Sequence, residues 1–308
     1  MFETDMAGYR GRLLNPIKTE QEVYPYRRVW RSLIVEMIFL GVAVASVFVA
    51  VAFLGLRIPA ALSIVISGIL VVLPVGLWLL LSVLPERRVA QPRQRLFFVL
   101  ILTALVANGI ALPFLNDFLN PHGWLPHESA INRILGYTFS LGIVQEVAKY
   151  LVLRYSIWRE HLRIRADAVA YAVAAAIAFG TMQNIAFILD NPALNLDIAA
   201  LRIFENIAIN VAASLFVSLG LAETRFNHPT PFFMTVTVAL GALVTGFAQP
   251  LTSGLVNAAF SVRGSLARPI FGLGFSAAVL LVSVLVTLFL YGAAERREQD
   301  RQRAEDAR

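Results

Sequence analysis

The residues best suited to chemistry in this chain are a carboxylate and an ammonium group inside a long apolar run. Glu146 and Lys149 are the two charged residues of the stretch from Ile134 to Leu153. An unpaired charge at the centre of a lipid bilayer costs roughly 2.5–3.5 kcal/mol on insertion scales, so an intramembrane Glu/Lys set is a functional hypothesis by default. The alternative is a buried structural ion pair that holds helices together without chemistry.

Further polar residues recur at a similar depth in the neighbouring apolar runs. Lys149 follows Glu146 by three residues and Gln145 by four, so on a helix it can reach both. At a rise of about 1.5 Å per residue, the next three runs place other polar groups between the midplane and the outer face: Gln183, Asn184, Glu205, Asn206, Asn210, Thr245 and Gln249. We therefore predict a polar cavity open to the outside, the alternative being interhelical hydrogen bonds worth about 0.6 kcal/mol each.

The elements that must position these groups are membrane-spanning helices. Hydrophobic residues make up 58% of the 308 residues and charged residues 15%, and several apolar runs exceed the roughly 20 residues that a helix needs to cross a bilayer. The runs are continuous rather than alternating, which excludes a β-barrel. We predict an all-α polytopic bundle of about eight spans, near residues 32–56, 58–84, 96–115, 133–156, 168–189, 202–221, 232–251 and 270–292.

The distribution of basic residues predicts the topology. Most arginines fall before residue 32, in the segments 87–95 and 154–165, and after residue 295, which by the positive-inside rule places both termini in the cytoplasm. The chain then divides into a cytoplasmic segment 1–31, a transmembrane domain 32–292 and a charged tail 293–308, either helical or disordered. The net charge of +6 reflects this topology rather than a nucleic-acid partner, and the absence of cysteine excludes thiolate chemistry.

Residues 130–255 resemble the PrsW-type intramembrane proteases, relatives of the CAAX prenyl-protease group. That family shows Glu-Glu-x-x-Lys on one span, a Gly-Phe-x-x-x-Glu-Asn-like segment on the next, a His followed four later by Ser or Thr, and a final His-x-x-x-Asn. The chain shows the same order in the runs 145–149 (QEVAK) and 178–184 (AFGTMQN), then in Asn210 with Ser214 and Thr245 with Gln249. The resemblance implies an intramembrane peptidase fold.

The departures from the family pattern are systematic. Gln145 and Gln183 stand where the family has glutamates, and Asn210 and Thr245 where it has histidines, whereas Glu146, Lys149 and Asn184 are kept. The family's acids and imidazoles are thought to activate water, through a divalent metal or as a general base. Amides supply neither a carboxylate nor an imidazole ligand. We therefore expect no metal or other cofactor, and doubtful activity at the motif positions Glu146, Lys149, Gln145, Gln183, Asn184 and Asn210.

Two routes to activity stay open in the sequence. His122 and His127, in the loop before the fourth span, could fold over the cavity as metal ligands. Glu146 could also act as a lone general base, with the neighbouring amides holding a carbonyl oxygen.

The resemblance and the buried polar residues leave three alternative functions. The first is a catalytically degenerate member that binds transmembrane helices of other membrane proteins, as regulator, scaffold or complex subunit. The second is an active protease cleaving single-span proteins near the outer face. The third is a small transporter or proton-conducting protein that uses Glu146 and Lys149. Whether the chain is an enzyme stays open. The partners expected are the lipid bilayer and transmembrane helices, not nucleic acid, and the expected location is the inner membrane of a bacterium.

Overall fold

A computed structural model describes residues 29–86, 93, 95–157, 161–192, 194–227, 232–257 and 268–306 of the chain. Every regular element within these ranges is helical. In chain order they are α2 (Val29–Phe48), η2 (Val49–Phe53), α3 (Ala60–Trp78), η3 (Leu79–Val83), α4 (Leu84–Glu86), α5 (Leu96–Val106), η4 (Ala107–Ala111), η5 (Phe114–Leu119), α6 (Pro121–Trp124), η6 (Leu125–His127), α7 (Ala130–Tyr137), η7 (Thr138–Gly142), α8 (Ile143–Ser156), α9 (Arg165–Asp190), α10 (Leu196–Phe226), α11 (Phe232–Asn257) and α12 (Arg268–Asp306).

The described part of the chain contains seven helices long and apolar enough to cross a membrane. They are Val29–Phe53, Ala61–Val83, Leu96–His127, Arg165–Asp190, Leu196–Phe226, Phe232–Thr252 and Ile270–Arg297. The predicted polytopic all-α bundle is therefore confirmed. The remaining predicted span, 133–156, is also helical throughout, from Ala130 to Ser156, but Gln145, Glu146 and Lys149 make its centre more polar than the other seven.

The first two spans pack against each other as a hairpin. Helices α2 and α3 are separated by an extended turn that contains Gly55, whose φ of +64° lies in the left-handed region. Glycine adopts this conformation without the steric cost that a Cβ imposes. The turn therefore lets two long apolar helices return on each other within a few residues.

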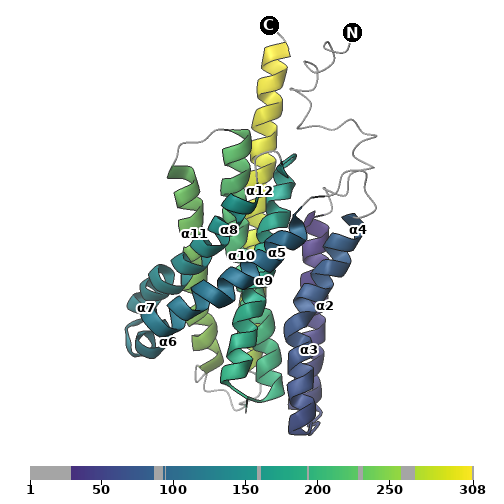
Figure 1. The fold of residues 1–308 in the computed structure, drawn as a ribbon, viewed down its shortest axis with the longest axis vertical. Helices are drawn as coiled ribbons and strands as arrows, with labels where there is room; N and C mark the ends of the chain where they lie inside the picture. The colour runs from purple at the N-terminus through teal and green to yellow at the C-terminus, as the bar shows by residue number, and fades with distance from the viewer. Residues whose placement is uncertain are drawn as a thin grey trace.

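Helix α10 is the centre of the bundle. It packs against α2, α3, α8, α9, α11 and α12, and 83% of its most apolar window is buried, against 28% for the spans of α2 and α3. Its closest partner is α9, where Ala174, Ala175 and Ala176 are all fully buried. Small residues let transmembrane backbones approach closely. Helices α9 and α10 thus form a tight pair around which the other spans are arranged (Figure 1).

Two of the other helical stretches run at a different angle. In Figure 1 the stretch from α5 towards α6 and the stretch from α7 into α8 lie obliquely, whereas α10, α11 and α12 follow the long axis. Both oblique stretches contain π-helical segments, η4 and η7. Such segments are rare and are frequent at functional sites. The oblique course carries residues 143–156 across the α9–α10 pair.

Ion pairs join the helices at one end of the bundle. Arg93 Nε lies 2.8 Å from Asp167 Oδ1 near the start of α9, and Arg165 forms an ion pair with Glu223 near the end of α10. Arginines predicted to face the cytoplasm therefore gather at the same end. The orientation of this end relative to a membrane stays a prediction.

The ends of the chain can be described in part. Trp30 and Tyr291 have ring centroids 6.0 Å apart, so the start of α2 lies beside the last part of the α12 span. Helix α12 continues to Asp306, so the tail is helical to that residue, one of the two forms expected. Residues 1–28 of the expected N-terminal segment lie outside the described residues.

Candidate functional site

A buried ion pair forms the centre of the predicted polar cluster. Glu146 and Lys149 are each 0% exposed, and Lys149 Nζ lies 2.6 Å from Glu146 Oε1. The same ammonium group donates a hydrogen bond of 3.1 Å to Asn210 Oδ1 on α10. The second carboxylate oxygen, Glu146 Oε2, accepts a 3.4 Å hydrogen bond from Ser214, one turn further along α10. Both charges of this ion pair are therefore anchored to the central helix.

A chain of amide groups continues from Lys149 between α9 and α10. The Nδ2 of Asn210 donates to Gln183 Oε1 at 2.8 Å and to the Asn206 carbonyl at 3.0 Å. Asn206 in turn donates to Asn184 Oδ1 at 2.9 Å. The structure thus brings five of the six predicted site residues into one hydrogen-bonded network and adds Asn206, which lies one turn from Asn210.

Gln145 is the predicted site residue outside this network. Its side chain is buried at 1% exposure, and both its amide oxygen and its amide nitrogen have no hydrogen-bond partner among the described residues. The hydroxyl of Thr245 is buried in the same unpaired state within the described part of the chain. A buried polar group without a partner costs about 1–3 kcal/mol. These two positions hold an amide and a hydroxyl where the resemblance places an acid and an imidazole.

Close packing seals the Glu146 side of the cluster. A Cβ on Gly241 of α11 would lie 3.2 Å from Glu146 Cγ and 2.8 Å from the Ala213 carbonyl oxygen, so α11 approaches as closely as a glycine allows. Lys149 Nζ lies 5.6 Å from the centroid of the Phe179 ring, within the range of a cation–π contact. Neither Gly241 nor Phe179 was singled out by the sequence as a site residue, because both act through packing between helices distant in the chain.

The cluster is less open than predicted. Gln183 and Asn206 are only partly buried, whereas Glu146 and Lys149 are fully enclosed. The predicted cavity open to the outside therefore does not extend to the charged pair. A molecule reaching the cluster from the Gln183 side meets amides first.

The loop histidines lie elsewhere. His122 Nδ1 is 3.3 Å from the hydroxyl of Tyr137, which precedes Glu146 by nine residues, or about 13 Å of helix. His127 is exposed. Within the described ranges no group of three or more His, Cys, Asp or Glu residues is placed to hold a metal ion.

Comparison with known families gives one match. The model of the family described as PrsW family intramembrane metalloprotease matches residues 91–289. This range is wider on both sides than the 130–255 of the sequence resemblance and contains all the cluster residues. It leaves out the hairpin of α2 and α3. No curated protein and no solved structure matches the chain.

Proposed function

The chain belongs to the PrsW family of intramembrane metalloproteases, and from this membership we propose that it is a catalytically degenerate member. In this proposal it binds transmembrane helices of other membrane proteins in the inner membrane of a bacterium, as a regulator, scaffold or complex subunit. The observation that carries the proposal is the position of Lys149, whose ammonium group bonds both Glu146 and Asn210.

The donor set of the cluster does not fit a catalytic metal. A catalytic zinc site uses three protein ligands drawn from His, Asp, Glu and Cys side chains, and the hydrogen-bonded cluster contains one, Glu146. That carboxylate is already paired with Lys149 at 2.6 Å, and the oxygen of Asn210 accepts from the same ammonium group. A divalent cation placed there would be repelled by a like charge in a medium of low dielectric constant. Metal-assisted hydrolysis therefore has no support from these residues.

Two observations weigh against Glu146 as a lone general base. A general base must reach the proton it abstracts directly or through one water, and Glu146 is 0% exposed. Gly241 approaches the Cγ atom of Glu146 so closely that no side chain fits between them. A substrate backbone would need still more room. An active protease would need α8, α10 and α11 to separate from the arrangement described above.

The exposed side of the cluster supports helix binding. Gln183 on α9 and Asn206 on α10 are polar groups that are only partly buried. Side-chain amides hold neighbouring transmembrane helices together by interhelical hydrogen bonds. A partner helix with a polar group at matching depth could bond to these amides without reaching Glu146.

The test combines metal analysis with proteolysis of a model single-span substrate. The wild-type protein is expected to contain no stoichiometric metal, to leave the substrate intact and to co-purify with a defined membrane protein. A variant carrying Gln145→Glu, Gln183→Glu, Asn210→His and Thr245→His together is expected to gain metal binding, because it restores the family's ligand types.

The decisive control is Glu146→Gln. Cleavage by wild-type protein that is lost in a folded Glu146→Gln variant would overturn the proposal in favour of an active protease. Glu146-dependent proton flux in liposomes, with no bound partner, would overturn it in favour of a proton-conducting protein.

A further inference from the structure

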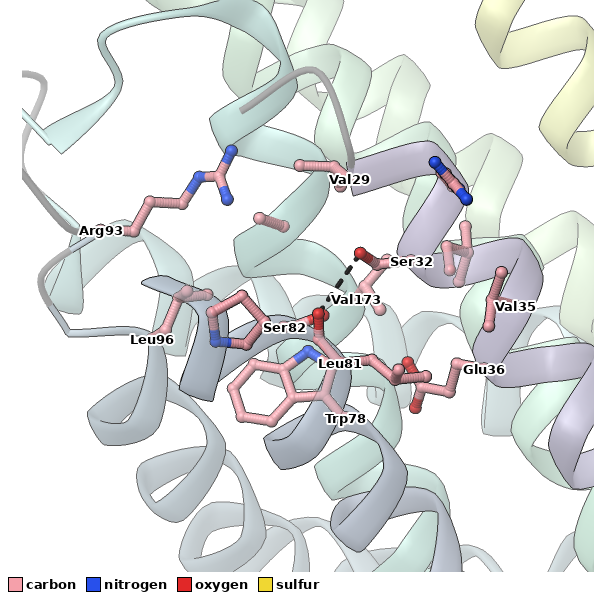
Figure 2. Close-up of a pocket in the computed structure, with 14 residues that line it drawn as sticks. Val29, Ser32, Val35, Glu36, Trp78, Leu81, Ser82, Arg93, Leu96 and Val173 are labelled. Carbon is pink, nitrogen blue, oxygen red and sulfur yellow. Dashed lines mark hydrogen bonds between the residues drawn. The ribbon is translucent and has the colours of Figure 1, made fainter. Parts of the chain in front are cut away.

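A separate cavity lies between the N-terminal hairpin and the core of the bundle. It has a volume of about 330 Å³ and is lined by residues of α2, α3, η3, α4 and α9, together with Arg93 and Leu96 (Figure 2). Two of these helices, α2 and α3, fall outside the range matched by the family model. The cavity therefore lies between the unmatched hairpin and the matched core, and it shares no lining residue with the Glu146 cluster.

Glu36 on α2 is the unusual residue of this cavity. Its side chain is 1% exposed, and neither carboxylate oxygen has a hydrogen-bond partner in the part of the chain that the structure describes. Figure 2 shows it reaching from α2 towards Trp78 of α3. Buried polar groups are normally hydrogen-bonded, and buried charges are paired. A carboxylate that the protein leaves unpaired at a cavity wall is a site for a cationic or hydrogen-bond-donating ligand.

Basic groups lie towards the end of the same cavity. Arg31 also lines it and is exposed; it precedes Glu36 by five residues, about 7.5 Å along the axis of α2. Arg93 lines it too and is held 2.8 Å from Asp167. The cavity thus offers an acid inside and an exposed arginine side chain nearer the start of α2, a pattern complementary to a headgroup with an ammonium and a phosphate.

We propose that this cavity binds the headgroup of a phospholipid that carries a primary ammonium group, with the ammonium at Glu36 and the phosphate towards Arg31. A lipid suits the site better than a soluble amine because α2 and α3 are among the least buried of the seven spans, at 28%, and expose Ile38, Phe39 and Leu80 to the surroundings. A cavity of this volume lies at the small end of ligand pockets, so it takes the headgroup while the acyl chains lie against the apolar helix surfaces.

The test measures thermal unfolding of the full-length protein in detergent micelles with added lipid. Phosphatidylethanolamine is compared with phosphatidylcholine of the same acyl chains, because the quaternary ammonium of choline cannot donate a hydrogen bond. Wild-type protein is expected to bind the ethanolamine lipid roughly tenfold or more tightly, the ratio that corresponds to one hydrogen bond to a charged group. Glu36→Gln is expected to lose this preference, and Arg31→Gln to weaken binding of both lipids.

The matched control is Glu205→Gln on α10. Glu205 is also buried, with one carboxylate oxygen unpaired among the described residues, but it lies outside the cavity, so this variant should keep the lipid preference. Equal stabilisation of wild-type protein by both lipids would overturn the proposal, and this comparison does not depend on any variant folding. Equal protection by free ethanolamine would overturn the assignment to a lipid. Glu36-dependent binding of a lysine-bearing transmembrane peptide, without a lipid preference, would instead indicate a protein ligand.

Discussion

Removing the ammonium group of Lys149 is the sharpest test of the buried pair. In Lys149→Met the carboxylate of Glu146 keeps its burial, at 0% exposure, but loses the partner at 2.6 Å and retains only the 3.4 Å hydrogen bond from Ser214. Breaking a buried pair by removing one partner costs about 3–5 kcal/mol, because it leaves an uncompensated charge. The expected result is a loss of that size in the free energy of unfolding, measured by denaturant titration in mixed micelles.

The double variant Glu146→Gln/Lys149→Met distinguishes this explanation from simple loss of packing. Replacing both members of a buried pair is often neutral or stabilising, so the double variant should be more stable than Lys149→Met, although it carries one more substitution. Ser214→Ala is the control for cluster packing and should cost no more than about 1.5 kcal/mol, the value of an ordinary hydrogen bond. Additive losses in the double variant, or a loss below about 1 kcal/mol for Lys149→Met, would refute the reasoning.

Three further changes test other parts of the structure by the same unfolding measurement. Gly241→Ala should destabilise the protein by about 1–3 kcal/mol through overpacking against Glu146 and Ala213. The control Gly68→Ala, whose Cβ would have nothing within 4 Å, should be neutral or stabilising. Equal effects of the two substitutions would contradict the close approach of α11. Gln145→Leu should be neutral or stabilising, because it removes a buried amide without a partner among the described residues, and a loss above about 2 kcal/mol would reveal a hidden partner. Asp167→Asn should cost about 1–3 kcal/mol, since a carboxylate that accepts from Arg93 and two backbone amides becomes neutral. An unchanged midpoint would show that these three contacts carry no stability.

The depth of the polar residues could be predicted from the sequence, and their pairing could not. The rise of a helix places Lys149, Asn210 and Gln183 at similar depths once the spans are known, and the hydrogen bonds from Lys149 to Asn210 and from Asn210 to Gln183 agree with this. The choice of partner depends on how the helices rotate about their axes. This rotation leaves Gln145, next to Glu146 in the chain, without a hydrogen bond among the described residues.

Features that depend on contacts between helices distant in the chain could not be predicted from the sequence for the same reason. Gly241 is one of several glycines in apolar runs, and its role beside Glu146 appears only when α11 is placed against α8. Glu36 is a single acid near the start of the first span, and the sequence does not show that the described part of the molecule gives it no partner. The predicted span 133–156 was recognisable as a helix, but not its oblique course (Figure 1).

The ammonium group bonded to Glu146 and Asn210 bears on how the cluster would depend on the supply of metal ions in the cell. A metal ion can be chelated, exchanged or depleted, and a site built around one changes with its supply. Lys149 is covalently part of α8, present once per chain at a fixed place. Under the proposed function, the cluster would keep the same charge and shape whatever the supply of metal ions.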